Sequence, residues 1–102
     1  MRPYSLSEEA EADLESILGY TARQWGLQQA ERYAEALEQA FILMAKGHTP
    51  LARPLPNLPD VVVFRCQHHY VFAQPRRGRV VILAILHENM DFMRHLHKRL
   101  PR

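Results

Sequence analysis

The sequence contains a single cysteine, Cys66, so it forms no internal disulfide and offers no multi-cysteine zinc site. Its longest uninterrupted apolar run, residues 80–86, has seven members, whereas a helix that spans a bilayer needs about 20. The first residues lead into acidic positions rather than into an apolar stretch, so no signal peptide is visible. These absences predict a cytoplasmic protein without a membrane partner.

The net charge is small, but the charged residues are unevenly distributed along the chain. The 102 residues suit one compact domain, expected over residues 1–102, with a net charge of +2. Residues 1–49 carry four basic and eight acidic side chains, whereas residues 50–102 carry nine basic and three acidic ones. One interpretation of this asymmetry is that the basic half binds an acidic partner or a nucleic acid. The other is that two acidic helices cover a basic sheet within the same domain.

The first half has the periodicity of two helices. Ser7 is a typical N-cap residue, and mainly apolar residues follow it at helical spacing as far as Trp25. Gly26 ends this helix, and a second apolar stripe runs from about residue 27 to residue 46, where Gly47 ends it. Two helices joined by a single glycine are predicted to form an antiparallel hairpin.

The second half has the pattern of strands. Residues 2–6 suit an edge strand, and residues 48–60, with four prolines, are predicted to be an extended loop without regular structure. Strands are expected at residues 61–67, 70–74 and 80–86, with Gly78 in the last hairpin turn. Asp91 then caps a short helix whose apolar face includes Met93 and Leu96. The predicted fold class is α+β, ordered β-α-α-β-β-β-α, with an antiparallel sheet packed by the helical hairpin and the C-terminal helix.

Several segments resemble the ParE toxins of the RelE/ParE type II toxin–antitoxin superfamily, and in particular the plasmid-encoded branch. Near the N-terminus these are YSLSEEAEADL at residues 4–14 and YTARQWG at residues 20–26. In the second half they are FRCQHHY at residues 64–70 and ILHENMD at residues 85–91. One departure is Asn89, because many members carry arginine at this position before the Met-Asp pair.

The resemblance implies a toxin that inhibits DNA gyrase by direct binding and is neutralised by a ParD-type antitoxin. It implies no cofactor, metal or catalytic residue. The alternatives are a RelE-like ribosome-dependent mRNA endonuclease and a degenerate member that only binds an antitoxin. The candidate residues for contact with antitoxin or gyrase are Arg65, His68, His69, Tyr70, His87, Met90, Asp91, Met93, Arg94 and Lys98.

The residues themselves favour binding over chemistry. RNA cleavage needs a base, an acid and cations beside the phosphate, but the expected strands contribute one internal arginine, Arg65. This lone charge in an apolar strand suggests a partner role, whereas solvent exposure or pairing with an acid is the simpler interpretation. Cys66 alternates with apolar neighbours and is predicted to be an inert core thiol. The adjacent pair His68 and His69 points to opposite strand faces and is unsuited to chelation.

Overall fold

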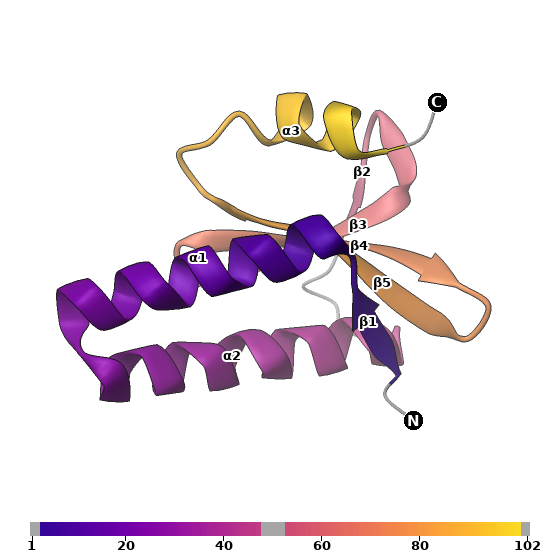
Figure 1. The fold of residues 1–102 in the computed structure, drawn as a ribbon. Coiled ribbons are helices and arrows are strands. Elements are labelled where there is room, and N and C mark those ends of the chain that lie inside the picture. The colour runs from indigo at the N-terminus through magenta and orange to yellow at the C-terminus, as the bar shows by residue number, and fades with distance from the viewer. Residues whose placement is uncertain (1–2, 48–52, 101–102) are drawn as a thin grey trace.

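The computed structural model describes residues 3–47 and 53–100, and within these residues it has five strands and three helices (Figure 1). The elements are β1 Tyr4–Leu6, α1 Glu8–Trp25, α2 Leu27–Lys46, β2 Arg53–Leu55, β3 Leu58–Cys66, β4 His69–Arg76, β5 Arg79–His87 and α3 Phe92–Arg99. The predicted α+β class and the predicted order are confirmed, with β2 as an additional strand.

The strands form one sheet in the order β1-β5-β4-β3-β2. β3, β4 and β5 make the predicted antiparallel meander, in which Arg65 lies opposite Tyr70 and His69 lies opposite His87. β1 pairs with β5 in parallel, with Tyr4 opposite Val80, so the complete sheet is mixed and the prediction of an antiparallel sheet holds only for β2 to β5. The N-terminal strand therefore lies at an edge and beside the last strand.

The helical hairpin has its ends where the local sequence places them. The Ser7 side chain accepts a hydrogen bond from the Ala10 N–H (3.1 Å) at the start of α1. Gly26, at φ 94°, separates α1 from α2, and Gly47, at φ 69°, ends α2 in the left-handed conformation that glycine adopts without steric cost. The predicted boundaries of both helices are confirmed.

Each face of the sheet has its own apolar core. Leu37 and Phe41 of α2 pack with Val71 and Ile82 on one face, under the helical hairpin. On the opposite face, Leu96 of α3 packs with a second set of residues that includes Phe72 and Leu86. β5 contributes to both cores, as expected for a strand that is apolar on both faces. Figure 1 shows α3 above the strands and α2 below them.

The proline-rich segment is only partly a loop. Residues 48–52 lie outside the described residues, but Arg53–Leu55 forms strand β2 and β3 begins at Leu58, three residues before the expected start. The prediction that residues 53–60 lack regular structure was therefore wrong. Pro54 pairs with Val62 in β2, which is an edge strand of the sheet, and edge strands are where proline is tolerated.

An ion pair connects α3 to α1 around the edge of β5. The Arg99 guanidinium donates to both Asp13 carboxylate oxygens (2.6 and 3.0 Å) and to the Leu83 carbonyl oxygen (3.1 Å). Asp13 also accepts a hydrogen bond from the Ile85 N–H (2.9 Å). Asp13 and Arg99 thus form hydrogen bonds with backbone groups of β5 beyond the three residues that pair with β1. Because these groups are bonded, this edge of β5 is not available for pairing with a strand of another chain.

Candidate functional site: a histidine cluster beside an aromatic groove

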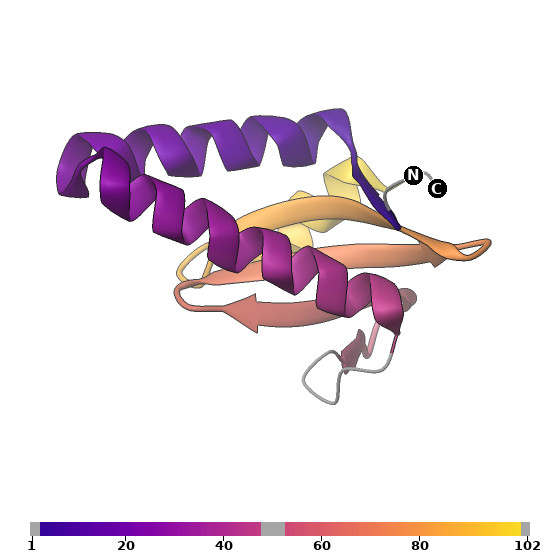
Figure 2. The ribbon, with the colours of Figure 1, turned by 90° about the horizontal axis from the view of Figure 1, so that it is seen from below.

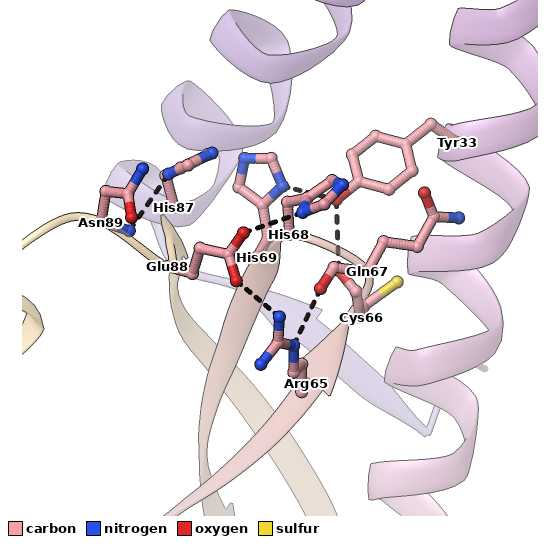
Figure 3. A network of polar contacts seen from close by, with 9 residues as sticks. All are labelled: Tyr33, Arg65, Cys66, Gln67, His68, His69, His87, Glu88 and Asn89. Carbon is pink, nitrogen blue, oxygen red and sulfur yellow. Dashed lines mark hydrogen bonds and ion pairs between the residues drawn. The ribbon is translucent and has the colours of Figure 1, made fainter.

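A polar cluster lies where the β3–β4 turn meets the end of β5 (Figure 3). Gln67, at φ 55°, reverses the chain between the two strands and brings His68 and His69 beside the last residues of β5. His87 lies opposite His69 on the neighbouring strand, and their rings form an edge contact with centroids 5.2 Å apart. Four residues predicted from the sequence therefore come together: Arg65, His68, His69 and His87.

Tyr33 of α2 anchors this cluster to the helical hairpin. Its hydroxyl donates to the Cys66 carbonyl oxygen (3.2 Å) and contacts Nδ1 of His69. Both contacts are satisfied when Nδ1 of His69 carries the proton and donates it to the tyrosine oxygen. Burial, assisted by the nearby Cys66, raises the pKa of Tyr33 to about 12. Burial and then the neighbouring His87 lower the pKa of His69, so the neutral imidazole is favoured here.

Glu88 connects the two sides of the turn. Its carboxylate pairs with the Arg65 guanidinium (2.5 Å) and with Nδ1 of His68 (2.8 Å). The hydrogen bond from His68, followed by the charge of Arg65, lowers the pKa of Glu88 and keeps the carboxylate ionised. Arg65 also donates a hydrogen bond to the Gln67 carbonyl oxygen (3.0 Å). The simpler interpretation of Arg65, that it pairs with an acid, is therefore met by Glu88 of the same chain.

A groove of about 670 Å³ opens beside the cluster, between the far end of the helical hairpin and the β3–β4 turn. Its lining residues are Ser16, Ile17, Tyr20, Thr21, Trp25, Gln29, Tyr33, Gln67, His68, His69 and His87. Trp25 is 72% exposed and Tyr20 57% exposed, which is unusual for large aromatic side chains. Trp25 shares the helical spacing of the apolar positions of α1, but its side chain lies largely in solvent.

The sequence reasoning missed the part of the groove that the helices contribute. Tyr20, Trp25, Gln29 and Tyr33 were absent from the predicted site, although the motif at residues 20–26 contains two of them. A signal was present in the sequence, because Trp25 is the only tryptophan and directly precedes the glycine that reverses the chain. Because Trp25 is at the tip of the helical hairpin, it lies beyond the end of the sheet that buries the rest of the hairpin.

The other predicted residues lie around α3, on the opposite face of the sheet. Asp91 caps this helix as predicted, accepting a hydrogen bond from the Arg94 N–H (3.3 Å). Met93 packs partly against the second core, whereas Met90, Arg94 and Lys98 are exposed.

Tyr70 belongs to the same face as α3. Its ring lies 6.0 Å from that of Phe92, and the Arg65 guanidinium lies 5.7 Å from the Tyr70 ring centre. Arg65 is therefore placed between the two groups of predicted residues. The structure thus divides the ten candidates into a group beside the groove and a group around α3.

Two further features bear on the chemistry of this region. Cys66 is buried, and burial raises the pKa of its thiol, which agrees with the predicted inert core cysteine. Within residues 3–47 and 53–100, no three His, Cys, Asp or Glu side chains are grouped as metal ligands would be. In the same described ranges, no helix is long and apolar enough to cross a membrane.

Comparison with known proteins defines the class first: residues 4–92 match the family described as "ParE toxin of type II toxin-antitoxin system, parDE". The chain is 46% identical to Toxin ParE of Escherichia coli over 98% of both chains. It is 41% identical to Toxin ParE1 of Caulobacter vibrioides over 94% of this chain and 99% of the relative. The chain therefore belongs to the ParE toxin family.

A solved structure supports the fold independently. A chain from "Chromosomal ParDE TA system from P. aeruginosa" superposes with a TM-score of 0.71 and 17% sequence identity. The match covers 85% of this chain and 96% of that chain. At this identity the likeness concerns the fold alone.

Proposed function

We propose that this ParE toxin inhibits DNA gyrase by direct binding and is neutralised by a ParD-type antitoxin. The observation that carries the proposal is the full-length similarity to proteins named as ParE toxins, at 46% and 41% identity. In this proposal the toxin has no chemistry of its own. It holds gyrase in a state in which cleaved DNA is not resealed.

The distribution of cations supports binding over RNA cleavage. A phosphate-cleaving site gathers its cations around one phosphate group. Here Arg65 lies opposite Tyr70 at one end of the meander, whereas Arg76 and Arg79 pair with each other at the other end. Tyr70 and Arg76 are six positions apart in β4, which corresponds to about 20 Å along a strand. Arg65 is in addition neutralised by Glu88.

The segment around α3 is the proposed contact with gyrase. Arg94 and Lys98 are exposed cations on this helix, and Met90 adds an exposed apolar side chain that is 38% accessible. Methionine and long cationic side chains adapt to a partner surface, which suits a docking helix. The apolar side of the same helix, with Leu96 buried, packs on the sheet and holds the exposed side in place.

The test measures two activities of the purified toxin in parallel. We expect inhibition of gyrase supercoiling and accumulation of cleaved DNA, with ribosome-bound mRNA left intact. Addition of the ParD-type protein encoded by the adjoining gene restores supercoiling. Codon-spaced cuts in mRNA together with unaffected supercoiling would favour the RelE-like alternative. Unaffected supercoiling and intact mRNA would indicate a member that only binds its antitoxin.

A further inference from the structure

The β4–β5 hairpin concentrates positive charge at its tip. Figure 2 shows this hairpin projecting at the end of the molecule opposite to the joined ends of α1 and α2. In the described residues, β3 pairs with β4 only as far as Ala73, and β1 pairs with β5 only from Val80 onward. The exposed side chains of Arg76, Arg77 and Arg79 are therefore held on a two-stranded ribbon that extends beyond the rest of the sheet.

A hollow of about 490 Å³ lies between this tip and the N-terminal strand, lined by Ser5, Arg76, Arg77, Arg79 and Val81. Ser5 lies opposite Val81. Arg76 lies opposite Arg79, so these four side chains share one face of the sheet. Val81 packs partly against the core under α3, so this is the face that carries α3. The described lining holds three guanidinium groups and a hydroxyl, without a carboxylate, histidine or tyrosine, and therefore suits binding of an anion rather than its cleavage.

The three arginines are not neutralised within the part of the chain that the structure describes. Across residues 3–47 and 53–100, the side chains that pair with carboxylates are Arg65, His68 and Arg99. Arg76 donates to the Gln74 side-chain oxygen (2.7 and 3.2 Å), which is a neutral acceptor. The positive charge at the hairpin tip is therefore available to a partner.

The arginines stand at positions that other residues would suit better. Arg76 and Arg79 face each other directly across the ribbon, where like charges destabilise the pairing. Arg77, at φ 36°, and Gly78, at φ 76°, form a two-residue turn in which asparagine usually precedes the glycine. A long side chain at positive φ is uncommon. Residues that break local rules in this way are expected at functional sites, and a bound anion would relieve the repulsion.

We propose that the tip of the β4–β5 hairpin binds the phosphate backbone of duplex DNA through the guanidinium groups of Arg76, Arg77 and Arg79, with the Ser5 hydroxyl as a further donor. Arginine presents planar pairs of N–H donors that match phosphate oxygens, and serine is a common donor to the DNA backbone. The inference goes beyond the proposed function, because it concerns a nucleic acid that the toxin itself contacts. It does not require gyrase to be the target.

The shape and the composition of the tip favour duplex DNA over other polyanions. The described lining of the hollow has no aromatic side chain on which a base of a single strand could stack. The major groove of B-form DNA admits a two-stranded ribbon, whereas that of duplex RNA is too narrow for side chains to read. Exposed carboxylates on the helical hairpin, such as Glu31 and Glu35, repel DNA and favour approach by the hairpin tip.

An acidic protein surface is the alternative occupant, and the lining of the hollow disfavours it. Protein interfaces depend on apolar or aromatic anchors at their centre, whereas contacts with DNA are more polar and more positively charged. Among the described lining residues, Val81 is the single apolar side chain, and it is half-buried.

The experiment measures binding of the purified full chain to a short, fluorescein-labelled DNA duplex by fluorescence anisotropy at increasing concentrations of NaCl. Neutralisation of three phosphates predicts a slope of about −2.7 for log Kobs against log salt, a loss of about fortyfold between about 50 and 200 mM salt. The variant that combines Arg76→Gln, Arg77→Asn and Arg79→Gln is expected to bind at least about thirtyfold more weakly at about 50 mM salt. An RNA duplex of the same sequence is expected to bind more weakly than the DNA duplex.

Arg77→Asn separates binding from folding. It removes one cation from the tip and places asparagine before Gly78, the pair that this turn prefers. We therefore expect the Tm to rise by about 2–4 °C while the salt slope becomes shallower by about 1. The matched control is Arg53→Gln, which removes the same charge from an exposed position of the edge strand β2, outside the lining of the hollow. We expect this control to leave the slope and the affinity nearly unchanged.

The outcomes separate this inference from the proposed function. The inference is overturned if the unaltered chain does not bind the DNA duplex at low salt, if Arg53→Gln weakens binding as much as Arg77→Asn, or if the RNA duplex binds as tightly as the DNA duplex. It is also overturned if the tip variants bind DNA normally but weaken a complex with antitoxin or gyrase, because the occupant would then be an acidic protein surface. A toxin that binds the duplex but leaves gyrase active would refute the proposed target and leave this inference standing.

Discussion

Replacement of Asp13 is expected to destabilise the fold more than replacement of any other acidic residue on the helices. The Asp13 and Arg99 side chains are each only 16% exposed, and two hydrogen bonds join them. Asp13 also accepts the Ile85 N–H, and Arg99 donates to the Leu83 carbonyl oxygen. One carboxylate therefore attaches α1 to β5 and, through Arg99, attaches α3 to both.

The expected magnitude follows from what Asp13→Ala leaves behind. Removal of one partner from a buried ion pair typically costs about 3–5 kcal/mol, because the remaining charge stays in a poorly solvated place. The Ile85 N–H also loses its acceptor, at a cost of about 1–3 kcal/mol if water does not replace it. Because Arg99 retains some access to solvent, we expect Asp13→Ala to lower the free energy of unfolding by about 3 kcal/mol in total. Asp13→Asn keeps an acceptor oxygen for Ile85 and should cost about half as much.

The measurement is urea unfolding followed by circular dichroism, with Glu15→Ala as the control. Glu15 is an exposed carboxylate on the same helix, and its replacement should change the free energy of unfolding by less than about 0.5 kcal/mol. A double-mutant cycle with Arg99→Ala should give a coupling energy of about 1.5–3 kcal/mol. If Asp13→Ala is no more destabilising than Glu15→Ala, the ion pair does not hold α3 and the reasoning is refuted.

Three further changes test the predicted residues. Arg94→Glu with Lys98→Glu should preserve folding and antitoxin binding but abolish growth arrest; full toxicity at the wild-type dose would mean that α3 serves core packing alone. Arg65→Ala breaks an exposed ion pair, so it should cost less than about 1 kcal/mol of stability yet weaken the antitoxin complex in calorimetry. An unchanged Kd would remove Arg65 from the interface. His69→Gln should reduce the loss of stability between about pH 7 and pH 5.5, measured by urea unfolding, and an identical loss would refute this.

The sign of the pH effect follows from the direction of the pKa shift. Burial lowers the pKa of folded His69, so the unfolded chain binds a proton at this residue more readily than the folded chain does. Stability is therefore lost as the pH falls below about 6.5, the ordinary pKa of histidine. Glu88, whose folded pKa is lowered, adds its own loss only as the pH falls below about 4.5.

The sequence predicted the elements whose determinants are local. Ser7, Gly26 and Gly47 bound the two long helices because capping and positive φ depend on single residues. Alternation of apolar residues predicted which face of β3 each residue occupies, and Phe64 and Cys66 do lie in the core under the helices. Motifs and alternation are properties of neighbouring positions, so they can be recognised without knowledge of the fold.

The features that the sequence did not predict depend on long-range contacts or on where a layer ends. Asp13 and Arg99 are 86 positions apart, and neither stands out from the other charged residues around it. Pro54 reads as a strand breaker until its place at the sheet edge is known. Trp25 has the periodicity of a core residue, but periodicity gives only the direction in which a side chain points. Whether a partner layer extends far enough to cover it is a property of the assembled fold.

The two groups of candidate residues lie on different faces of the sheet, and the proposed neutralisation has to be considered for each face. The groove lies on the helical-hairpin face of the sheet, whereas α3 packs on the opposite face, so one compact segment in the groove does not by itself cover Arg94 and Lys98. The Glu88 cluster lies between them, with His68 at the groove and Arg65 against Tyr70 on the α3 face. An antitoxin segment that contacts Arg65, as the Arg65→Ala prediction requires, would therefore lie close to the face that carries α3. A carboxylate on that segment would compete with Glu88 for the Arg65 guanidinium, so binding there would break the ion pair between Arg65 and Glu88.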